Sequence, residues 1–62
     1  MRTTSIIHCK NANYQIDFQG SKNCCMSEFV TQCKSFQAIW ATLFNEDNGE
    51  AIMTYTGERV KL

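Results

Sequence analysis

Five side chains of this sequence are of the types that bind zinc or act as nucleophiles: His8, Cys9, Cys24, Cys25 and Cys33. Zinc holds each thiolate sulfur about 2.3 Å away, and paired cysteine ligands usually follow a Cys-x-x-Cys spacing that this sequence lacks. In a helix, Cys25 and Cys33 would lie about 12 Å apart along the axis, at about 1.5 Å per residue. We therefore expect no metal and no cofactor, and expect the cysteines to act as small apolar side chains. A zinc-stabilised module is kept as an alternative.

The single histidine, His8, is not expected to form a catalytic pair with Cys9, because neighbours in a strand project to opposite faces. The acidic side chains fall in expected turns or on expected solvated faces, with no pair spaced for acid–base catalysis. They are Asp17, Glu28, Glu46, Asp47, Glu50 and Glu58. The three glycines are isolated turn residues rather than a phosphate-binding loop. The sequence therefore predicts a protein that is not an enzyme.

Length and charge narrow the class of protein further. With 62 residues, the chain is expected to form a single domain over residues 1–62. A domain of this size buries only about 60% of the surface of its unfolded chain, which leaves a thin margin of stability. Six basic and six acidic residues cancel, which argues against binding held mainly by nucleic-acid phosphates. We expect no signal peptide and no membrane partner, and hence a cytoplasmic protein with reduced cysteines.

Two strands are expected at the start of the chain. Residues 2–9 have the alternation of a strand and lead to an asparagine-rich turn. Residues 14–19 alternate apolar and polar side chains, with Tyr14, Ile16 and Phe18 on one face. One buried face and one solvated face are typical of an antiparallel sheet.

A helix is expected next, capped by Ser21 or Asn23. Its apolar side chains recur at i, i+3, i+4 and i+7. They are Met26, Phe29, Val30 and Cys33. The periodicity permits the helix to stop near Ser35 or to continue as one long helix over residues 24–44. We favour the earlier end, because residues 36–44 are rich in aromatic and β-branched side chains.

Two apolar runs, residues 38–44 and 51–56, flank the sequence Asp-Asn-Gly at residues 47–49. Asn-Gly is the strongest short-range signal of a two-residue hairpin turn, because both residues tolerate positive φ. Residues 59–62 are long enough for a further short strand, whose charges would protect its edge. The predicted fold is α+β, a single antiparallel sheet of four or five strands with one helix on one face, in the order ββαββ. The long helix would instead give ββαβ.

One helix covers only one face of such a sheet, and the sequence holds more large apolar side chains than that face needs. The covered face is expected to contain Tyr14, Ile16, Phe18, Ile39, Leu43 and Ile52. Aromatic residues and methionine, which are enriched in interface cores, are then expected on the uncovered face. They are Trp40, Phe44, Met53 and Tyr55. If the faces are reversed, or if the long helix forms, this exposed surface does not exist.

Charged residues near the ends of these strands are expected to form a rim that orients a partner. They are Glu46, Asp47, Arg59 and Lys61. The rim and the exposed apolar residues together predict a surface that binds either a second copy of the chain, giving a homodimer, or a larger foreign protein.

The order of the elements resembles that of small phage-encoded inhibitors of host systems, including some anti-CRISPR proteins. The resemblance covers most of the chain as layout: strand, helix, residues 36–44, the Asn-Gly turn, residues 51–55 and a basic final strand. It implies a non-enzymatic protein that occludes a surface on a larger host protein complex, in the host cytoplasm, and it assigns no individual residue. The alternative function is a nucleic-acid-binding regulator, in which Trp40 and Tyr55 stack on bases beside Arg59 and Lys61.

Overall fold

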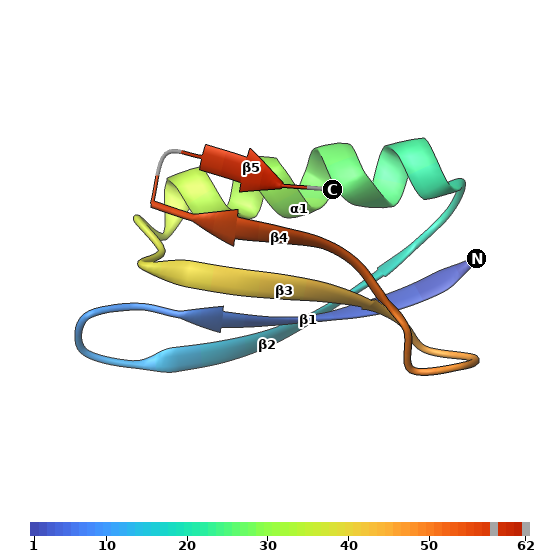
Figure 1. The fold of residues 1–62 in the computed structure, drawn as a ribbon, viewed down its shortest axis with the longest axis horizontal. Coiled ribbons are helices and arrows are strands. Elements are labelled where there is room, and N and C mark those ends of the chain that lie inside the picture. Colours follow the sequence, from blue (N-terminus) through green and yellow to red (C-terminus); the bar gives the residue numbers. More distant parts are fainter. Residues whose placement is uncertain (58, 62) are drawn as a thin grey trace.

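The computed structural model describes residues 1–57 and, as backbone alone, residues 59–61. In chain order its elements are β1 (Arg2–His8), β2 (Asn13–Gln19), α1 (Lys22–Ser35), β3 (Trp40–Asn45), β4 (Ala51–Thr56) and β5 (Arg59–Lys61). The strands form one sheet, with α1 packed on one face (Figure 1). The predicted α+β fold with the order ββαββ is confirmed, and β5 is the short fifth strand. The long helix over residues 24–44 is wrong, because α1 ends at Ser35.

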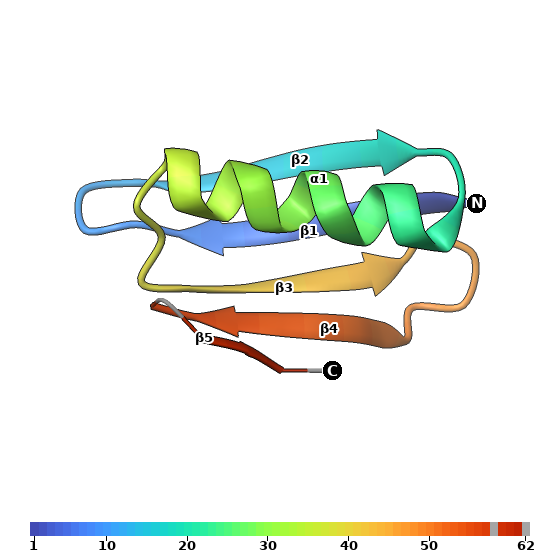
Figure 2. The same cartoon turned by 90° about the horizontal axis from the view of Figure 1, so that it is seen from above.

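The strands lie side by side in the order β2-β1-β3-β4-β5 (Figure 2). Every neighbouring pair is antiparallel. The first strand therefore pairs on both sides, with β2 and with β3, and α1 crosses the sheet face to connect these two strands. The two edges of the sheet are β2 and β5.

The helix begins at a polar cap, as predicted. The Ser21 hydroxyl accepts a hydrogen bond from the Cys24 N–H at 3.2 Å, which satisfies one of the free donors of the first turn. Two residues of the predicted apolar stripe, Phe29 and Cys33, are buried, together with Cys25, which the prediction leaves out. The flanking Met26 and Val30 are half-buried and pack against the core.

The helix ends in a Schellman motif that contains no glycine. The Ala38 N–H donates to the Cys33 carbonyl oxygen at 2.9 Å, and the Gln37 N–H donates to the Lys34 carbonyl oxygen at 3.2 Å. Gln37 adopts the left-handed conformation, with φ of 55°, a position that usually belongs to glycine. The motif turns the chain back toward the sheet, so β3 begins only at Trp40.

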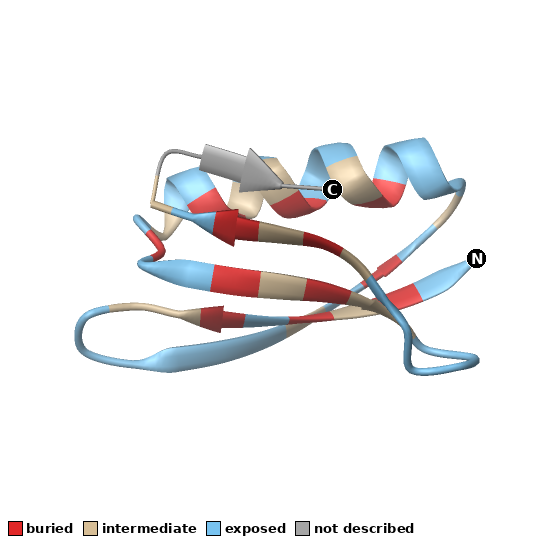
Figure 3. Cartoon of the chain, in the orientation of Figure 1, coloured by how far each residue is buried: buried red, intermediate tan, exposed pale blue. Residues whose placement is uncertain are grey.

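The core lies between α1 and the sheet face that the helix covers (Figure 3). Phe29 of the helix, Ile7 of β1 and Leu43 of β3 are completely buried. Burying side chains of this size stabilises the fold by about 1.5–3 kcal/mol each. Met53 and Tyr55 of β4 lie in the same core, each 4% exposed.

Two hydroxyl side chains of β1 are also buried in the covered face. Thr3 donates to the Phe18 carbonyl oxygen at 3.3 Å, and Ser5 donates to the Ile16 carbonyl oxygen at 2.9 Å. Both bonds reinforce the pairing of β1 with β2. Within the described residues, no buried side-chain nitrogen or oxygen lacks a hydrogen-bond partner.

The predicted assignment of side chains to the covered face is only partly correct. Phe18 is buried and Ile16 is half-buried on this face, as predicted for β2, and Leu43 is also buried. Ile39 is 53% exposed, because it precedes β3 and does not take part in the alternation of that strand. Tyr14 remains 42% exposed on the edge strand β2.

Substitutions at two neighbouring positions of β4 test this distribution of side chains. Met53→Ala should lower the free energy of unfolding by about 2–5 kcal/mol, because it leaves a cavity beneath the helix. Thr54→Ala is the matched control on the uncovered face, and the loss of its half-buried side chain should lower the free energy of unfolding by only about 1 kcal/mol. Urea unfolding followed by circular dichroism measures both. A larger loss of stability for Thr54→Ala than for Met53→Ala would mean that the two faces are exchanged.

Candidate functional site

The four apolar side chains predicted to share the uncovered face are divided between the two faces. Trp40 and Phe44 lie on the uncovered face, where Trp40 is 46% exposed and Phe44 is half-buried. Met53 and Tyr55 lie beneath α1 in the core. The prediction that Met53 and Tyr55 form part of an exposed surface is therefore wrong.

The register between β3 and β4 explains this difference. A two-residue Asn-Gly turn would place Phe44 opposite Met53. Instead, the Gly49 N–H donates to the Asn45 carbonyl oxygen at 2.7 Å and closes a wider turn. The pairing also shifts after Leu43, and Leu43 itself lies opposite Met53. Because side chains alternate, a change of one residue in register moves a whole strand's side chains to the other face.

The uncovered face carries its own set of apolar and aromatic side chains on three adjacent strands, β1, β3 and β4. We name this set the open-face patch: Ile6, His8, Trp40, Thr42, Phe44 and Thr54. Thr42 is at its centre, opposite Ile6 on one side and Thr54 on the other. Ile6 is 39% exposed, and Trp40 is the most exposed member. The patch therefore combines large apolar side chains with the methyl groups of threonine.

Sequence analysis named only Trp40 and Phe44 of the open-face patch. It missed Ile6, His8, Thr42 and Thr54. The alternation of residues 2–9 shows that Ile6 and His8 share a face. What it does not show is that β1 pairs with β3 and brings this face beside Trp40. Ile52 lies at the register shift between the two strands and, as predicted for the covered face, packs half-buried against the core.

His8 and Trp40 form a stacked aromatic pair within the patch. They lie directly opposite each other on β1 and β3, with ring centroids 3.7 Å apart and an interplanar angle of 17°. Stacking of this kind contributes about 0.5–1.5 kcal/mol beyond simple burial. It also holds the indole in one orientation, which would lower the entropic cost of a contact made through this ring.

The part of the uncovered face over β2 is polar. The Thr4 hydroxyl donates to an Asp17 carboxylate oxygen at 2.6 Å, and the Gln15 amide donates to the Thr4 hydroxyl oxygen at 3.3 Å. The open-face patch is thus bordered on one side by a hydrogen-bonded polar strip, as in many interfaces with an apolar centre and a polar rim.

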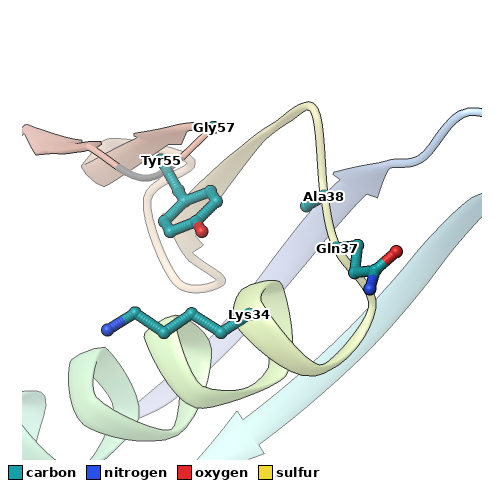
Figure 4. Close-up of a pocket in the computed structure, with 5 residues that line it drawn as sticks. All are labelled: Lys34, Gln37, Ala38, Tyr55 and Gly57. Carbon is teal, nitrogen blue, oxygen red and sulfur yellow. The ribbon is translucent and has the colours of Figure 1, made fainter.

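Two hollows lie near the start of β3 and the end of β4. The first is shallow and mostly apolar, and it extends the open-face patch beside the indole. Its lining residues are Ile39, Trp40, Ala41, Thr42, Thr54, Tyr55 and Thr56. The second lies at the end of α1, where the Tyr55 ring projects from β4 toward the helix near the Lys34 side chain (Figure 4). Its lining supplies an ammonium, a phenol and an amide, without a carboxylate, imidazole or thiol among the described residues.

The predicted charged rim falls at two places. Glu46 and Asp47 are exposed in the loop after β3, next to Phe44. Backbone pairing places Arg59 opposite Thr56 and Lys61 opposite Thr54. The side chains of Arg59 and Lys61 lie outside the described residues. The acidic pair therefore lies at the loop end of the β3–β4 hairpin, whereas the two basic positions lie beside the second half of β4.

The thiols are dispersed over the fold. Cys25 and Cys33 are buried in the core, Cys24 is exposed, and the half-buried Cys9 donates its thiol hydrogen to the Phe36 carbonyl oxygen at 3.5 Å. Over residues 1–57 and 59–61, no three His, Cys, Asp or Glu side chains are grouped to hold a metal ion. Burial raises the pKa of the Cys33 thiol from its ordinary 9.0 to about 11, and the neighbouring Cys9 adds to the shift.

Comparison with known proteins found no matching family model, no matching curated protein and no matching solved structure. Among the described residues, no helix has both the length and the apolar character needed to cross a membrane.

The raised pKa of Cys33 predicts a specific dependence of stability on pH. The folded state holds the thiol proton more tightly than the unfolded state does, so unfolding is favoured once the unfolded thiol ionises. The contribution of the Cys33 thiol to the free energy of unfolding is complete below pH 9, and it is lost as the pH rises toward 11. The free energy of unfolding should therefore fall over this interval.

Comparison of two variants isolates the effect of Cys33 from other groups that titrate at high pH. Cys33→Ala should show a shallower fall in the free energy of unfolding between pH 9 and 11, although it starts from a lower value because of the cavity. Cys24→Ala is the exposed control and should keep the wild-type slope. Equal slopes in wild type and Cys33→Ala would contradict the assignment.

Proposed function

We propose that this protein is a non-enzymatic binding protein that docks on a larger protein through its open-face patch. The observation that carries this function is the exposure of Trp40 and Ile6 on a sheet face that no described element covers. Large apolar side chains grouped on one face of a small domain are typical of protein-binding surfaces. The function requires no cofactor and no catalytic group.

Trp40 is the central anchor of this surface. Tryptophan is enriched among the residues that dominate binding energy, especially when water-excluding neighbours surround it. Here those neighbours are the stacked His8 ring, Thr42 on the same strand and Thr56 opposite. Phe44 supplies a second aromatic contact at the other end of β3.

The charged residues contribute mainly to orientation and to the rate of encounter. Glu46 and Asp47 are exposed beside the Phe44 end of the surface. Arg59 and Lys61 pair by backbone with the β4 residues near the Trp40 end. A partner with the opposite arrangement of charge would bind in one orientation and not in the reverse.

The layout of the chain, which resembles that of small phage-encoded inhibitors such as some anti-CRISPR proteins, supports a specific mode of action. In this mode the protein covers a functional surface on a larger host complex in the cytoplasm and blocks access to it. The exposed Trp40 ring of the His8–Trp40 stack also supports a second candidate, a nucleic-acid-binding regulator, because aromatic side chains stack on unpaired bases.

The double substitution Trp40→Ala and Phe44→Ala tests the proposed surface. It should leave a folded protein by circular dichroism and weaken partner binding by at least about a hundredfold, because two anchors are lost. Thr31→Ala, on the exposed side of α1, is the control and should bind as wild type. Affinity capture from a bacterial lysate, with mass spectrometry, would identify the partner, and titration with that partner would give the affinities.

Two outcomes would count against this function. Equal binding by wild type and the double variant would exclude the open-face patch as the contact. Loss of folding in the double variant would show that Trp40 and Phe44 act as core residues. A mobility shift of single-stranded DNA or RNA that weakens steeply with added salt would instead favour the nucleic-acid-binding regulator.

A further inference from the structure

The strand β2 forms a free edge of the sheet. It is seven residues long, and no described element lies beyond it in the strand order (Figure 2). An edge strand presents unpaired backbone N–H and C=O groups, which can pair with another strand. The opposite edge, β5, has only three residues.

The pattern of backbone hydrogen bonds shows which groups of β2 point outward. The Cys9 N–H donates to the Ala12 carbonyl oxygen at 2.9 Å, and the Gly20 N–H donates to the Met1 carbonyl oxygen at 3.0 Å. Antiparallel ladders alternate between hydrogen-bonded and non-hydrogen-bonded pairs. The residues that make these two bonds at either end of β2, Ala12 and Gly20, are even-numbered. By this alternation, the even-numbered residues of β2 form the backbone hydrogen bonds with β1. The odd-numbered residues direct their N–H and C=O groups away from the sheet, and they are Asn13, Gln15, Asp17 and Gln19.

This edge lacks the features that usually prevent pairing between molecules. Natural edge strands are often protected by lysine, by proline or by a bulge. The sequence of β2 contains no lysine, arginine or proline, and its pairing with β1 runs without a shift. Its single charge is the Asp17 carboxylate, which accepts a hydrogen bond from the Thr4 hydroxyl. The sequence of β5, in contrast, includes both Arg59 and Lys61.

The sequence of β2 reads alike in both directions by chemical type. From Asn13 to Gln19 it runs polar, aromatic, polar, isoleucine, polar, aromatic, polar. We propose that β2 pairs with β2 of a second copy of the chain, in antiparallel fashion, about a two-fold axis at Ile16. This dimer goes beyond the proposed function and does not depend on it.

The proposed register satisfies the backbone and the side chains together. With the axis at Ile16, Gln15 faces Asp17 of the second copy and Asn13 faces Gln19. All of these residues direct their backbone groups outward, so each such pair exchanges two backbone hydrogen bonds. A register displaced by one residue would instead oppose outward-directed groups to inward-directed ones.

The side chains in this register also match. Tyr14 faces Phe18 of the second copy, and the two Ile16 side chains face each other, in pairs with Cα atoms about 4.5 Å apart. On the other face, each Gln15 amide faces the Asp17 carboxylate of the second copy, so the two like charges are not placed opposite each other. Tyr14 remains accessible for this pairing, being 42% exposed while its ring stacks on Phe36.

Dimerisation at β2 would join two five-stranded sheets into one. A two-fold axis perpendicular to the sheet keeps both helices on one side and both open-face patches on the other. Each copy would then present its Trp40 on a common surface, which allows bivalent attachment to a repetitive or symmetric target.

A proline at an outward-directed position tests the pairing without removing a hydrogen bond to β1. Gln15→Pro deletes an outward N–H and is compatible with an edge strand. Gln15→Ala is the matched control, since it loses the same side chain and keeps the N–H. Sedimentation equilibrium from micromolar to millimolar concentration should show a dimer for wild type, and a weaker dimer for Gln15→Ala because its amide no longer faces Asp17 of the second copy. The dissociation constant of the Gln15→Pro dimer should be at least about tenfold higher than that of the Gln15→Ala dimer, because the outward N–H is lost as well.

A disulfide cross-link tests the register and remains informative if Gln15→Pro fails to fold. In a Cys24→Ser background, Ile16→Cys should form an intermolecular disulfide rapidly, because paired residues on the axis fall within the Cα separation that a disulfide needs. Gln19→Cys is the control, since its two copies lie far apart in this register. A wild-type protein that stays monomeric to millimolar concentration would overturn the proposal. Equal dimerisation of Gln15→Pro and Gln15→Ala, or faster cross-linking at Gln19→Cys than at Ile16→Cys, would also overturn it.

Discussion

The pairing of Leu43 with Met53 decides what each face of the β3–β4 hairpin does. It is set by the connecting loop, where the Asn45 carbonyl accepts from Gly49 and the Asn45 side chain accepts from the Asp47 N–H at 2.9 Å. These bonds close a turn wider than two residues. With this register, Met53 and Tyr55 complete the core beneath α1, while Trp40 and Phe44 are left on the uncovered face.

The remaining architecture follows from having one helix and one sheet. A single helix buries one face, so the other must be stabilised by its own contacts: the His8–Trp40 stack, cross-strand threonines and the bonds of Thr4 to β2. These contacts hold the side chains of the uncovered face in fixed orientations, with an apolar centre and a polar border. The helix also connects β2 to β3 and so leaves β2 at the edge. The proposed binding surface and the proposed pairing edge therefore both follow from a small fold whose described residues form no second covering layer.

Local patterns in the sequence predict most of the fold, because alternation, capping and the apolar stripe depend on near neighbours. The strand β2, the Ser21 cap and the buried positions Phe29 and Cys33 are of this kind. The helix end is less apparent, since Gln37 occupies the left-handed position where glycine is the usual signal. The pairing of β1 with β3 and the register of the hairpin depend on distant contacts and on turn geometry. For this reason the sequence places Trp40 and Phe44 correctly on the uncovered face but places Met53 and Tyr55 there wrongly, since both lie in the core.

The register of β3 against β4 determines which side chains lie on the uncovered face, and nuclear magnetic resonance measures this register directly. In antiparallel pairs without hydrogen bonds, opposite Cα atoms are about 4.5 Å apart and their Hα protons are in close contact. The described register predicts a strong nuclear Overhauser effect between the Hα protons of Thr42 and Thr54, which lie opposite each other. A strong contact of Thr42 with Tyr55 instead would establish the two-residue turn. It would return Met53 and Tyr55 to the face of Trp40 and contradict the surface described above.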